Sequence, residues 1–404
     1  MKPYRLPLSV VAACSLAGPL AAPAAEAPLE TRLERALAVP QIDRTRTAAV
    51  AIDLRSGELV YARNPGRPLA PASTAKLAVS YAGLVRLGPE YRIETQLLGE
   101  GFRDATRWQG DLVLKGYGDP TLSKWDLKAL ARRVRAQGIR RVTGAVVADE
   151  SYFDARRVAP GWKSSYYIEE SPPLSALVVD RARFRGRTST RPALRAAERL
   201  HAELRAVGVR VARRARLGRA SDLAEPLART LSPPLAVVLK ALNRDSDNFA
   251  AELLLKHLGA YERGKGTSTA GAAVVLDVLR EAAIPIAGVR IADGSGLSLY
   301  DRLTAQTLAG ILVASWDDPD LRGVMLASLA VSGRSGTLEP RLRGPAVAGR
   351  VFAKTGTTAL SSALAGYVSS RYVFAVLHNG SPVAWQWARV AQDNFVKVLA
   401  TSAG

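Results

Sequence analysis

Alternating apolar and polar positions predict β-strands near both ends of the chain. Residues 47–54 alternate as TAAVAIDL, and LVYARN follows after the turn RSGE, where we expect a positive φ at Gly57. Near the other end, RVFAKTG, ALAGYVSS and RYVFAVLHN are short and rich in β-formers, and WQWARVAQDNFVKVLA has the spacing of an amphipathic helix. These patterns predict an α/β (α+β) fold, in which one antiparallel sheet built from both ends is flanked by helices.

The middle of the chain divides into two parts with different patterns. Residues 94–220 mix short strands, such as DLVLKGYGDP and VTGAVVADE, with basic helices at 127–137 and 192–207. From residue 231 to 329 the apolar spacing is again helical. We therefore expect an inserted α/β domain at 94–220, between two parts of the main domain at 28–93 and 221–404.

The first residues have the layout of an export signal. Lys2 and Arg5 precede an apolar run and small residues at 22–24, so residues 1–24 are expected to be a secretory signal peptide. The stretch VAAC also resembles a lipobox, which leaves lipidation at Cys14 as the alternative. Cys14 is the only cysteine, so cleavage after it excludes disulfides and thiolate metal sites. No later apolar run is long enough for a transmembrane anchor.

The formal net charge of +20 indicates anionic surroundings. Nucleic acid is not expected as a partner of an exported protein. Arginines concentrate in residues 94–220. This part therefore either docks on an anionic wall polymer or presents a solvated basic face, and the sequence leaves both readings open.

A serine and a lysine stand three residues apart in the stretch APASTAKLAV, where a loop enters an apolar helix. Side chains at i and i+3 of a helix share one face, so Ser73 and Lys76 are within reach of each other. A serine hydroxyl is a poor nucleophile until a base takes its proton. Lysine can be that base when burial or a second cation lowers its pKa. Otherwise Lys76 is an ordinary helix charge.

Histidine, the usual base, occurs only three times, and the pattern favours a structural role for each. His201 lies in an arginine-rich helix, His257 follows an apolar helix face, and His378 ends a strand. A G-x-S-x-G elbow is missing from the sequence as well. With no clustered carboxylates either, we expect no metal site and no cofactor.

Two further motifs follow Ser73 and Lys76 in order. NRDSDNFAAE contains Ser246 and Asn248 just before a predicted helix, and VFAKTGTTAL contains Lys354-Thr355-Gly356 on a predicted strand. S-x-x-K, S-D-N and K-T-G are the three motifs of penicillin-binding proteins and serine β-lactamases. Each is weak evidence alone, but all three in order and in compatible elements are strong evidence.

Further stretches, GYGDPTL, ADESYF, PPLSALVVD and DGSGLS, extend a resemblance over nearly all of the chain after the signal. The chain resembles the D-alanyl-D-alanine carboxypeptidases/endopeptidases, which are low-molecular-mass, class C penicillin-binding proteins. The resemblance implies a serine β-lactamase/DD-peptidase-like fold, with its catalytic domain at 28–93 and 221–404 and an accessory domain at 94–220. It implies peptidoglycan stem peptides as substrates and β-lactams as inhibitors.

The resemblance also implies roles for the motif residues. Ser73 would be the acylated nucleophile and Lys76 its base. Ser246 would relay protons to the leaving amine. Asn248 would hold the peptide amide of the substrate, and Lys354 would supply a second cation.

Substrate binding is implied at the third motif. Thr355 would bind the terminal carboxylate, and the backbone N–H groups of Ser73 and Thr357 would form the oxyanion hole. Gly356, without a side chain, would let the substrate backbone approach. A candidate pocket for the stem peptide consists of Trp162, Glu169, Leu297 and Thr358. The spacing around APGWKSSYYIEESPP differs from that of the family, and Leu299 stands where the family often has arginine, so an ordinary loop is the alternative.

Two other functions remain open at this stage. A β-lactamase, esterase or D-amino-acid amidase would use the same fold and motifs. The sequence lacks the E-x-x-L-N segment of some β-lactamases, which favours a penicillin target with slow deacylation. A non-catalytic basic protein that binds the cell wall is the third reading, and the intact motifs argue against it.

Overall fold

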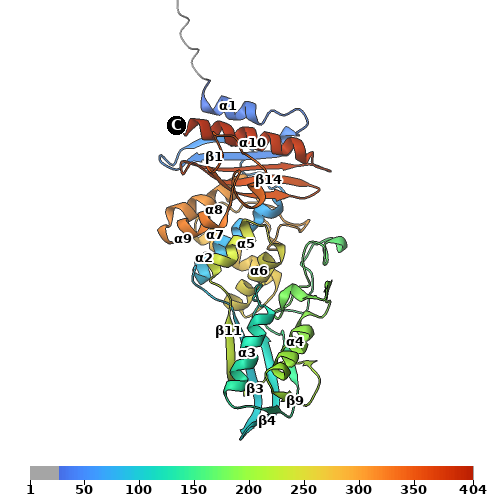
Figure 1. Ribbon diagram of the computed structural model, residues 1–404. Helices are drawn as coiled ribbons and strands as arrows, with labels where there is room; N and C mark the ends of the chain where they lie inside the picture. The colour runs from blue at the N-terminus through green and yellow to red at the C-terminus, as the bar shows by residue number, and fades with distance from the viewer. Residues whose placement is uncertain (1–26, 404) are drawn as a thin grey trace, which may run out of the picture.

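The computed structural model describes residues 27–403, which form a six-stranded and a seven-stranded β-sheet at opposite ends of an elongated molecule with a helical layer between them (Figure 1). The predicted signal peptide at 1–24, including Cys14, lies outside the described residues. None of the helices within residues 27–403 is long and apolar enough to cross a membrane.

The first sheet is built from both ends of the chain, as predicted. Its six strands are all antiparallel and lie in the order β12-β13-β14-β15-β1-β2. The turn between β1 and β2 contains Gly57 at φ +73°. The strands are β1 (Thr47–Asp53), β2 (Leu59–Arg63), β12 (Ala330–Val331), β13 (Val351–Thr357), β14 (Ser361–Val368) and β15 (Tyr372–Asn379).

Helices cover both faces of this sheet, which explains why β14 and β15 are buried almost throughout. One face packs against α1 (Leu29–Ala36) and α10 (Trp385–Ser402). The other face packs against the helical layer. This layer comprises α2 (Lys76–Leu87), α5 (Leu235–Asn243), α6 (Asn248–Arg263), α7 (Ser268–Glu281), α8 (Ala305–Asp317) and α9 (Pro319–Ser328).

The second sheet belongs to the inserted part and is mixed rather than antiparallel. β3 and β4 form a long antiparallel hairpin, whereas β6 pairs with β4 in parallel. α3 (Lys124–Ala136) and α4 (Pro192–Ala206) pack their apolar stripes on this sheet. The strands are β3 (Glu94–Asp104), β4 (Arg107–Gly116), β5 (Arg141–Val142), β6 (Val146–Asp149), β9 (Arg210–Val211), β10 (Arg216–Leu217) and β11 (Glu225–Leu231).

The predicted end of the insertion at residue 220 is too early. β11 pairs with β3 from Glu225 to Leu231, so the chain leaves the second sheet only after Leu231. β11 is mostly exposed and lacks the alternating apolar pattern that marks a strand in a sequence. Its position is set by pairing with a distant strand, which a local pattern does not reveal.

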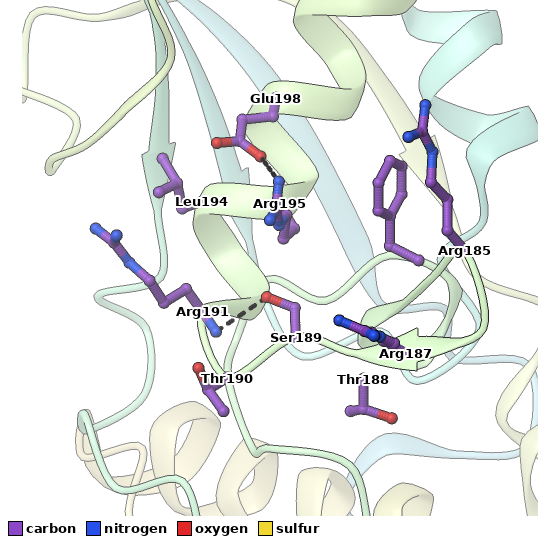
Figure 2. Close-up of a pocket in the computed structure, with 10 residues that line it drawn as sticks. Arg185, Arg187, Thr188, Ser189, Thr190, Arg191, Leu194, Arg195 and Glu198 are labelled. Carbon is purple, nitrogen blue, oxygen red and sulfur yellow. Dashed lines mark hydrogen bonds and ion pairs between the residues drawn. The ribbon is translucent and has the colours of Figure 1, made fainter.

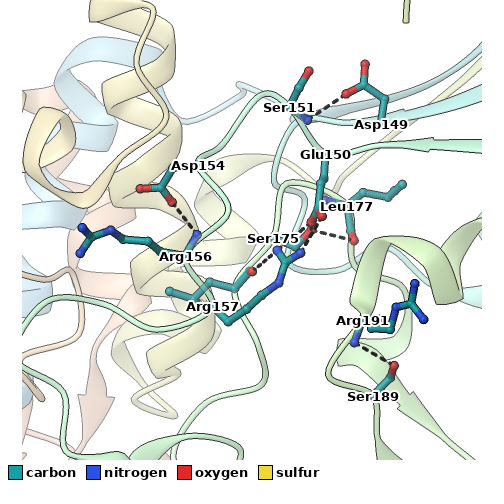
Figure 3. Close-up of polar contacts among 11 residues, drawn as sticks. Asp149, Glu150, Ser151, Asp154, Arg156, Arg157, Ser175, Leu177, Ser189 and Arg191 are labelled. Atoms are coloured by element: carbon teal, nitrogen blue, oxygen red, sulfur yellow. Dashed lines mark hydrogen bonds and ion pairs between the residues drawn. The ribbon is translucent and has the colours of Figure 1, made fainter. Parts of the chain in front are cut away.

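A loop from the inserted part crosses to the helical layer and helps to build the site. Phe153 and Leu174 on this loop pack with Phe249 of α6. An ion-pair network fixes the loop, because Arg157 donates to both carboxylate oxygens of Glu150 at 2.7 and 2.6 Å (Figure 3). The same carboxylate accepts a hydrogen bond from Ser175.

Candidate active site

Ser73 lies where a 3₁₀ turn (Ala72–Ala75) leads into α2, rather than inside the α-helix that the sequence predicts. The turn is held between two glycines. A side chain at Gly296 would overlap the carbonyl oxygen of Ala72, and a Cβ at Gly356 would lie 3.1 Å from the backbone nitrogen of Ser73. The space beside Gly356 is therefore occupied by the serine turn. The absence of a side chain at Gly356 serves this packing, and the approach of a substrate backbone there stays a prediction.

Lys76 is the first residue of α2, and it is 0% exposed. Its Nζ lies 2.9 Å from Ser73 Oγ, and it donates to Asn248 Oδ1 at 2.8 Å and to the carbonyl of Ser295 at 2.7 Å. Burial lowers the pKa of Lys76 to about 8, against the opposing charge of Asp293. A nitrogen that loses its proton near neutral pH, at hydrogen-bond distance from a serine hydroxyl, is a suitable general base.

Ser246 and Lys354 form a second pair in the same cleft. Ser246 sits at φ +62° just before α6, and Lys354 lies on β13. Nζ of Lys354 is 2.9 Å from Ser246 Oγ and 2.8 Å from the carbonyl of Thr355. Lys354 is 0% exposed, and burial together with the charge of Lys76 lowers its pKa well below the usual range. The two lysines differ in the serine that they contact. In the structure described, Lys76 contacts Ser73 and Lys354 contacts Ser246.

Asn248 is positioned by the start of α6. Asp247 caps this helix by accepting from the backbone N–H of Ala250, and it is held by Arg181 through hydrogen bonds of 2.5 and 2.7 Å. Asn248 thereby directs Oδ1 at Lys76, while its Nδ2 donates to the carbonyl of Glu170 at 3.1 Å.

A buried acidic cluster supports the loop that carries Ser295. The carboxylate of Asp293 accepts from Ser295 Oγ at 2.6 Å, and Glu252 accepts from the backbone of Gly294 at 2.6 Å. Burial and the charge of Asp293 raise the pKa of Glu252 to about 8 and that of Asp301 well above its usual range. These contacts fix the Ser295 carbonyl that accepts from Lys76.

The motif residues face a common cleft with a volume of about 580 Å³. Ser73, Ser246 and Asn248 line it from the helical side, and Thr355 and Thr357 line it from β13. Thr355 Oγ1 donates to Thr337 at 2.7 Å. The two lysines lie beneath the serines, so the predicted catalytic residues are brought together.

The residues of the candidate stem-peptide pocket are not brought together in this cleft. Leu297 lines it, but Thr358 lines a neighbouring cavity of about 430 Å³ and Glu169 lines a third cavity. The indole of Trp162 donates to Asp293 at 2.5 Å. The acidic group that reaches the cleft is Glu170 and not Glu169, which corrects the choice between these adjacent residues.

Sequence reasoning missed two arginines at the β13 side of the cleft. Arg341 follows the short helix 336–338, and Arg389 comes from α10. Arg389 Nη2 lies 3.5 Å from Thr357 Oγ1. Within the described residues the buried Nε atoms of both arginines have no hydrogen-bond partner. Arg341 is paired with Asp393 at 2.6 Å, whereas Arg389 makes no ion pair within the described residues, so Arg389 is the cation on this side that is suited to an anionic ligand.

The three histidines, all within the described residues, lie outside the lining of this cleft. His257 contacts the carbonyl of Tyr117 through Nδ1 and the hydroxyl of Tyr91 through Nε2, and burial lowers its pKa to about 4. His378 is buried against Thr47, and burial lowers its pKa to about 3. His201 lies on α4 of the inserted part. This arrangement agrees with structural roles for the histidines.

Fold and site together fit a serine peptidase in which a lysine stands beside the serine hydroxyl. The chain belongs to the D-Ala-D-Ala carboxypeptidase 3 (S13) family, which it matches over residues 29–190 and 183–402. The predicted family, fold class and enzyme class are thereby confirmed.

Relatives with known names are similar over most of their length. The chain is 32% identical to carboxypeptidase DacB of Mycolicibacterium smegmatis, across 92% of this chain and 83% of the relative. It is 29% identical to a D-alanyl-D-alanine carboxypeptidase of Actinomadura sp. (strain R39), across 87% of this chain and 81% of the relative. The crystal structure of penicillin binding protein 4 (dacB) from Haemophilus influenzae shares the fold, with a TM-score of 0.80 at 21% identity, across 92% of this chain and 98% of that one.

Proposed function

We propose that this protein is a serine DD-peptidase that cleaves the terminal D-Ala-D-Ala bond of peptidoglycan stem peptides through an acyl-Ser73 intermediate. D-Alanyl cross-links present the same D-alanyl carbonyl, joined to an amine of another stem peptide, and are a second substrate. The observation that carries the proposal is the arrangement of Ser73, Lys76 and Asn248 beside Ser246 and Lys354 in one cleft. The family to which the chain belongs supports this substrate class.

Acylation begins when neutral Lys76 takes the hydroxyl proton of Ser73 across their 2.9 Å contact. Ser73 Oγ then attacks the carbonyl carbon of the penultimate D-alanine. The backbone N–H groups of Ser73 and Thr357 stabilise the negative charge that develops on the carbonyl oxygen. Asn248 holds the peptide amide on the other side of the scissile bond.

The leaving group departs through the second pair. As the C–N bond breaks, the amine of the terminal D-alanine takes a proton from the Ser246 hydroxyl, which Lys354 holds across a contact of 2.9 Å. The proton that Lys76 took from Ser73 replaces it on Ser246, so Lys76 is neutral again once the acyl ester has formed. A water molecule then attacks the carbonyl carbon of the acyl ester, and Lys76 takes one proton from this water. Lys76 passes the proton to Ser73 Oγ as the ester C–O bond breaks, so Ser73 recovers its hydroxyl and the peptide acid is released. Atoms and charge balance over the two steps.

The terminal carboxylate of the substrate fits the basic side of the cleft. Thr355 and Arg389 line this side, and Arg389 makes no ion pair within the described residues, whereas Arg341 is paired with Asp393 at 2.6 Å. Guanidinium groups bind carboxylates through charge-assisted, often paired, hydrogen bonds. We therefore assign Arg389 to the carboxylate of the terminal D-alanine.

Penicillin is the expected inhibitor, because its strained amide presents the same carbonyl and carboxylate to Ser73. Penicillin binding protein 4 from Haemophilus influenzae, which shares the fold, has been crystallised with a β-lactam. The substrate lies outside the cytoplasm, in agreement with the export pattern at residues 1–24.

The test is D-alanine release from a soluble acetylated peptide that ends in D-Ala-D-Ala. Wild-type protein should release D-alanine, and Ser73→Ala should not. Ser80→Ala is the matched control, because Ser80 lies on α2, which directly follows the Ser73 turn, is buried, and contacts Asn243 rather than the cleft. Release by Ser73→Ala at the wild-type rate, or no release by the wild type, would contradict the proposal.

A further inference from the structure

A second basic cavity lies in the inserted part. It has a volume of about 550 Å³ and lies between the hairpin of β7 (Arg183–Phe184) and β8 (Arg187–Thr188) and the first turns of α4 (Figure 2). Its lining includes Phe184 and three hydroxyl residues of the chain leading into α4. We call it the arginine pocket, after the residues Arg185, Arg187, Arg191 and Arg195 that line it together with one carboxylate, Glu198.

The positive charge of this pocket is largely uncompensated. Glu198 pairs with Arg195 at 2.5 Å, whereas Arg185, Arg187 and Arg191 make no ion pair within residues 27–403. Four arginines less one carboxylate leave a charge of +3 around one cavity. By contrast, an arginine of the neighbouring loop is neutralised by two hydrogen bonds to Glu150 (Figure 3).

Two of the arginines are ordered by stacking on Phe184, and one of these, Arg185, is not neutralised by an ion pair. The guanidinium of Arg185 lies 5.3 Å and that of Arg195 lies 5.5 Å from the centre of the Phe184 ring. Stacking on a ring orders a guanidinium and leaves its N–H groups free to bind an anion in its plane. Arg185 also occupies a turn position at φ +48°, where asparagine, aspartate or glycine is usual. Strained positions of this kind are retained where they serve a function.

The arginine pocket is connected to the catalytic cleft by shared residues. Thr188 lines both the pocket and an intermediate cavity, and Glu170 lines both that cavity and the catalytic cleft. Arg181, two residues before the hairpin, is paired with Asp247 of the S-D-N motif.

We propose that the arginine pocket binds the free carboxylates of polymeric peptidoglycan, on a stem peptide adjacent to the one in the catalytic cleft. This proposal rests on the proposed function, and it makes the polymer, rather than a free peptide, the preferred substrate. Peptidoglycan carries several free carboxylates along each strand, and guanidinium groups bind carboxylates in pairs. Occupying both sites with one polymer raises the apparent affinity beyond that of either site. A phosphate-bearing polymer matches the charge, but the connection to the cleft favours peptidoglycan.

The experiment is co-sedimentation with insoluble peptidoglycan that has been acid-extracted to remove phosphate polymers. All proteins carry Ser73→Ala, so that the polymer is not digested. Adding Arg187→Ala and Arg191→Ala should weaken binding by about tenfold or more. Arg213→Ala with Arg214→Ala is the matched control, because these arginines are exposed, lie in the same part of the chain and do not line the pocket. The control should bind within about twofold of its parent.

Two further arms identify the ligand and separate this proposal from the proposed function. Amidation of the peptidoglycan carboxylates should abolish the difference between the pocket variant and its parent. When Ser73 is left intact, the Arg187→Ala/Arg191→Ala variant and the Arg213→Ala/Arg214→Ala variant should both release D-alanine from the soluble peptide at the wild-type rate. Failure of that release in the wild type would remove the proposed function, while the sedimentation result would still test the pocket.

Three results would overturn the proposal. The first is equal sedimentation of the pocket variant and its parent. The second is binding that survives amidation in full. The third is pocket-dependent binding of soluble polyphosphate with none to extracted peptidoglycan, which would make a phosphate polymer the ligand. A thermal unfolding curve of each variant checks that the fold is retained.

Discussion

The catalytic cleft and the arginine pocket are both basic, but they hold their cations in opposite ways. Lys76 and Lys354 are 0% exposed, and burial lowers the pKa of each. Arg187 and Arg191 are exposed, and an arginine keeps its proton throughout the physiological range. Burial thus turns one set of cations into proton carriers, whereas exposure leaves the other as permanent charges. This difference agrees with proton transfer as the role of the buried lysines in the cleft and with polymer binding as the role of the exposed arginines in the pocket.

The largest effect should come from removing the base. Lys76→Met keeps an unbranched, buried side chain but cannot take the Ser73 proton, so D-alanine release should fall by about a thousandfold or more. Lys256→Met is the matched control, because Lys256 is also buried on a helix but pairs with Asp154 outside the cleft. Rates per folded molecule are compared, with folding checked by thermal unfolding. If Lys256→Met lost activity and Lys76→Met kept it, the assignment of Lys76 as the general base would be wrong.

The next largest effect should be the dependence of peptidase activity on pH. Lys76 must be neutral to accept a proton, and burial lowers its pKa from 10.5 to about 8. The value of kcat/KM for the soluble peptide should therefore rise about tenfold per pH unit below pH 8 and level off above it. Sedimentation with peptidoglycan should stay constant from pH 6 to 9, since arginines and carboxylates keep their charges. A flat or falling kcat/KM below pH 8 would contradict a base role for Lys76.

Arg389 is intermediate between the buried lysines and the exposed arginines. It is half-buried, and it lines the cleft without belonging to either serine–lysine pair. Arg389→Ala should raise KM about tenfold for a peptide with a free terminal carboxylate. The same variant should change KM little when that carboxylate is replaced by an amide. Arg343→Ala, which removes an exposed arginine outside the cleft, serves as control. An equal rise in KM for the acid and for the amide would show that Arg389 does not bind the terminal carboxylate.

The smallest effect should be that of salt, and it should separate the two regions. Raising NaCl from about 0.05 to 0.5 M screens exposed charges, so peptidoglycan binding through the arginine pocket should weaken several-fold. The buried contact between Lys76 and Ser73 is screened much less, so the turnover number for the soluble peptide should change by less than about twofold. Salt-insensitive sedimentation would argue against an electrostatic pocket.

The sequence predicted those parts of the molecule that depend on local patterns. Ser73 and Lys76 are three residues apart, and the strand with Lys354 has a clear β-pattern. Motifs and periodicity therefore predicted that Ser73 and Lys76 lie close together and that Lys354 lies on a strand, although Ser73 itself lies in the 3₁₀ turn before α2. Arg389 could not be predicted in this way. It lies on the C-terminal helix and reaches the cleft only because α10 packs against the sheet that contains β13.

The inserted part was harder to predict for the same reason. β11 has no apolar alternation and is defined by its pairing with β3, so its inclusion in the insertion required the tertiary structure. Glu169 and Glu170 are adjacent and chemically equal in the sequence. Only the path of the loop against α6 determines that Glu170 reaches the cleft.

The central claim is that Ser73 is a nucleophile activated by buried Lys76, and intact mass measurement with benzylpenicillin tests it most directly. Wild-type protein should gain the mass of one penicillin and keep it for many minutes, because a penicillin target deacylates slowly, whereas Ser73→Ala should gain nothing. An adduct on Ser73→Ala, or no adduct and no penicillin consumption by the wild type, would contradict the account. Consumption of penicillin without a lasting adduct would instead identify a β-lactamase on the same fold.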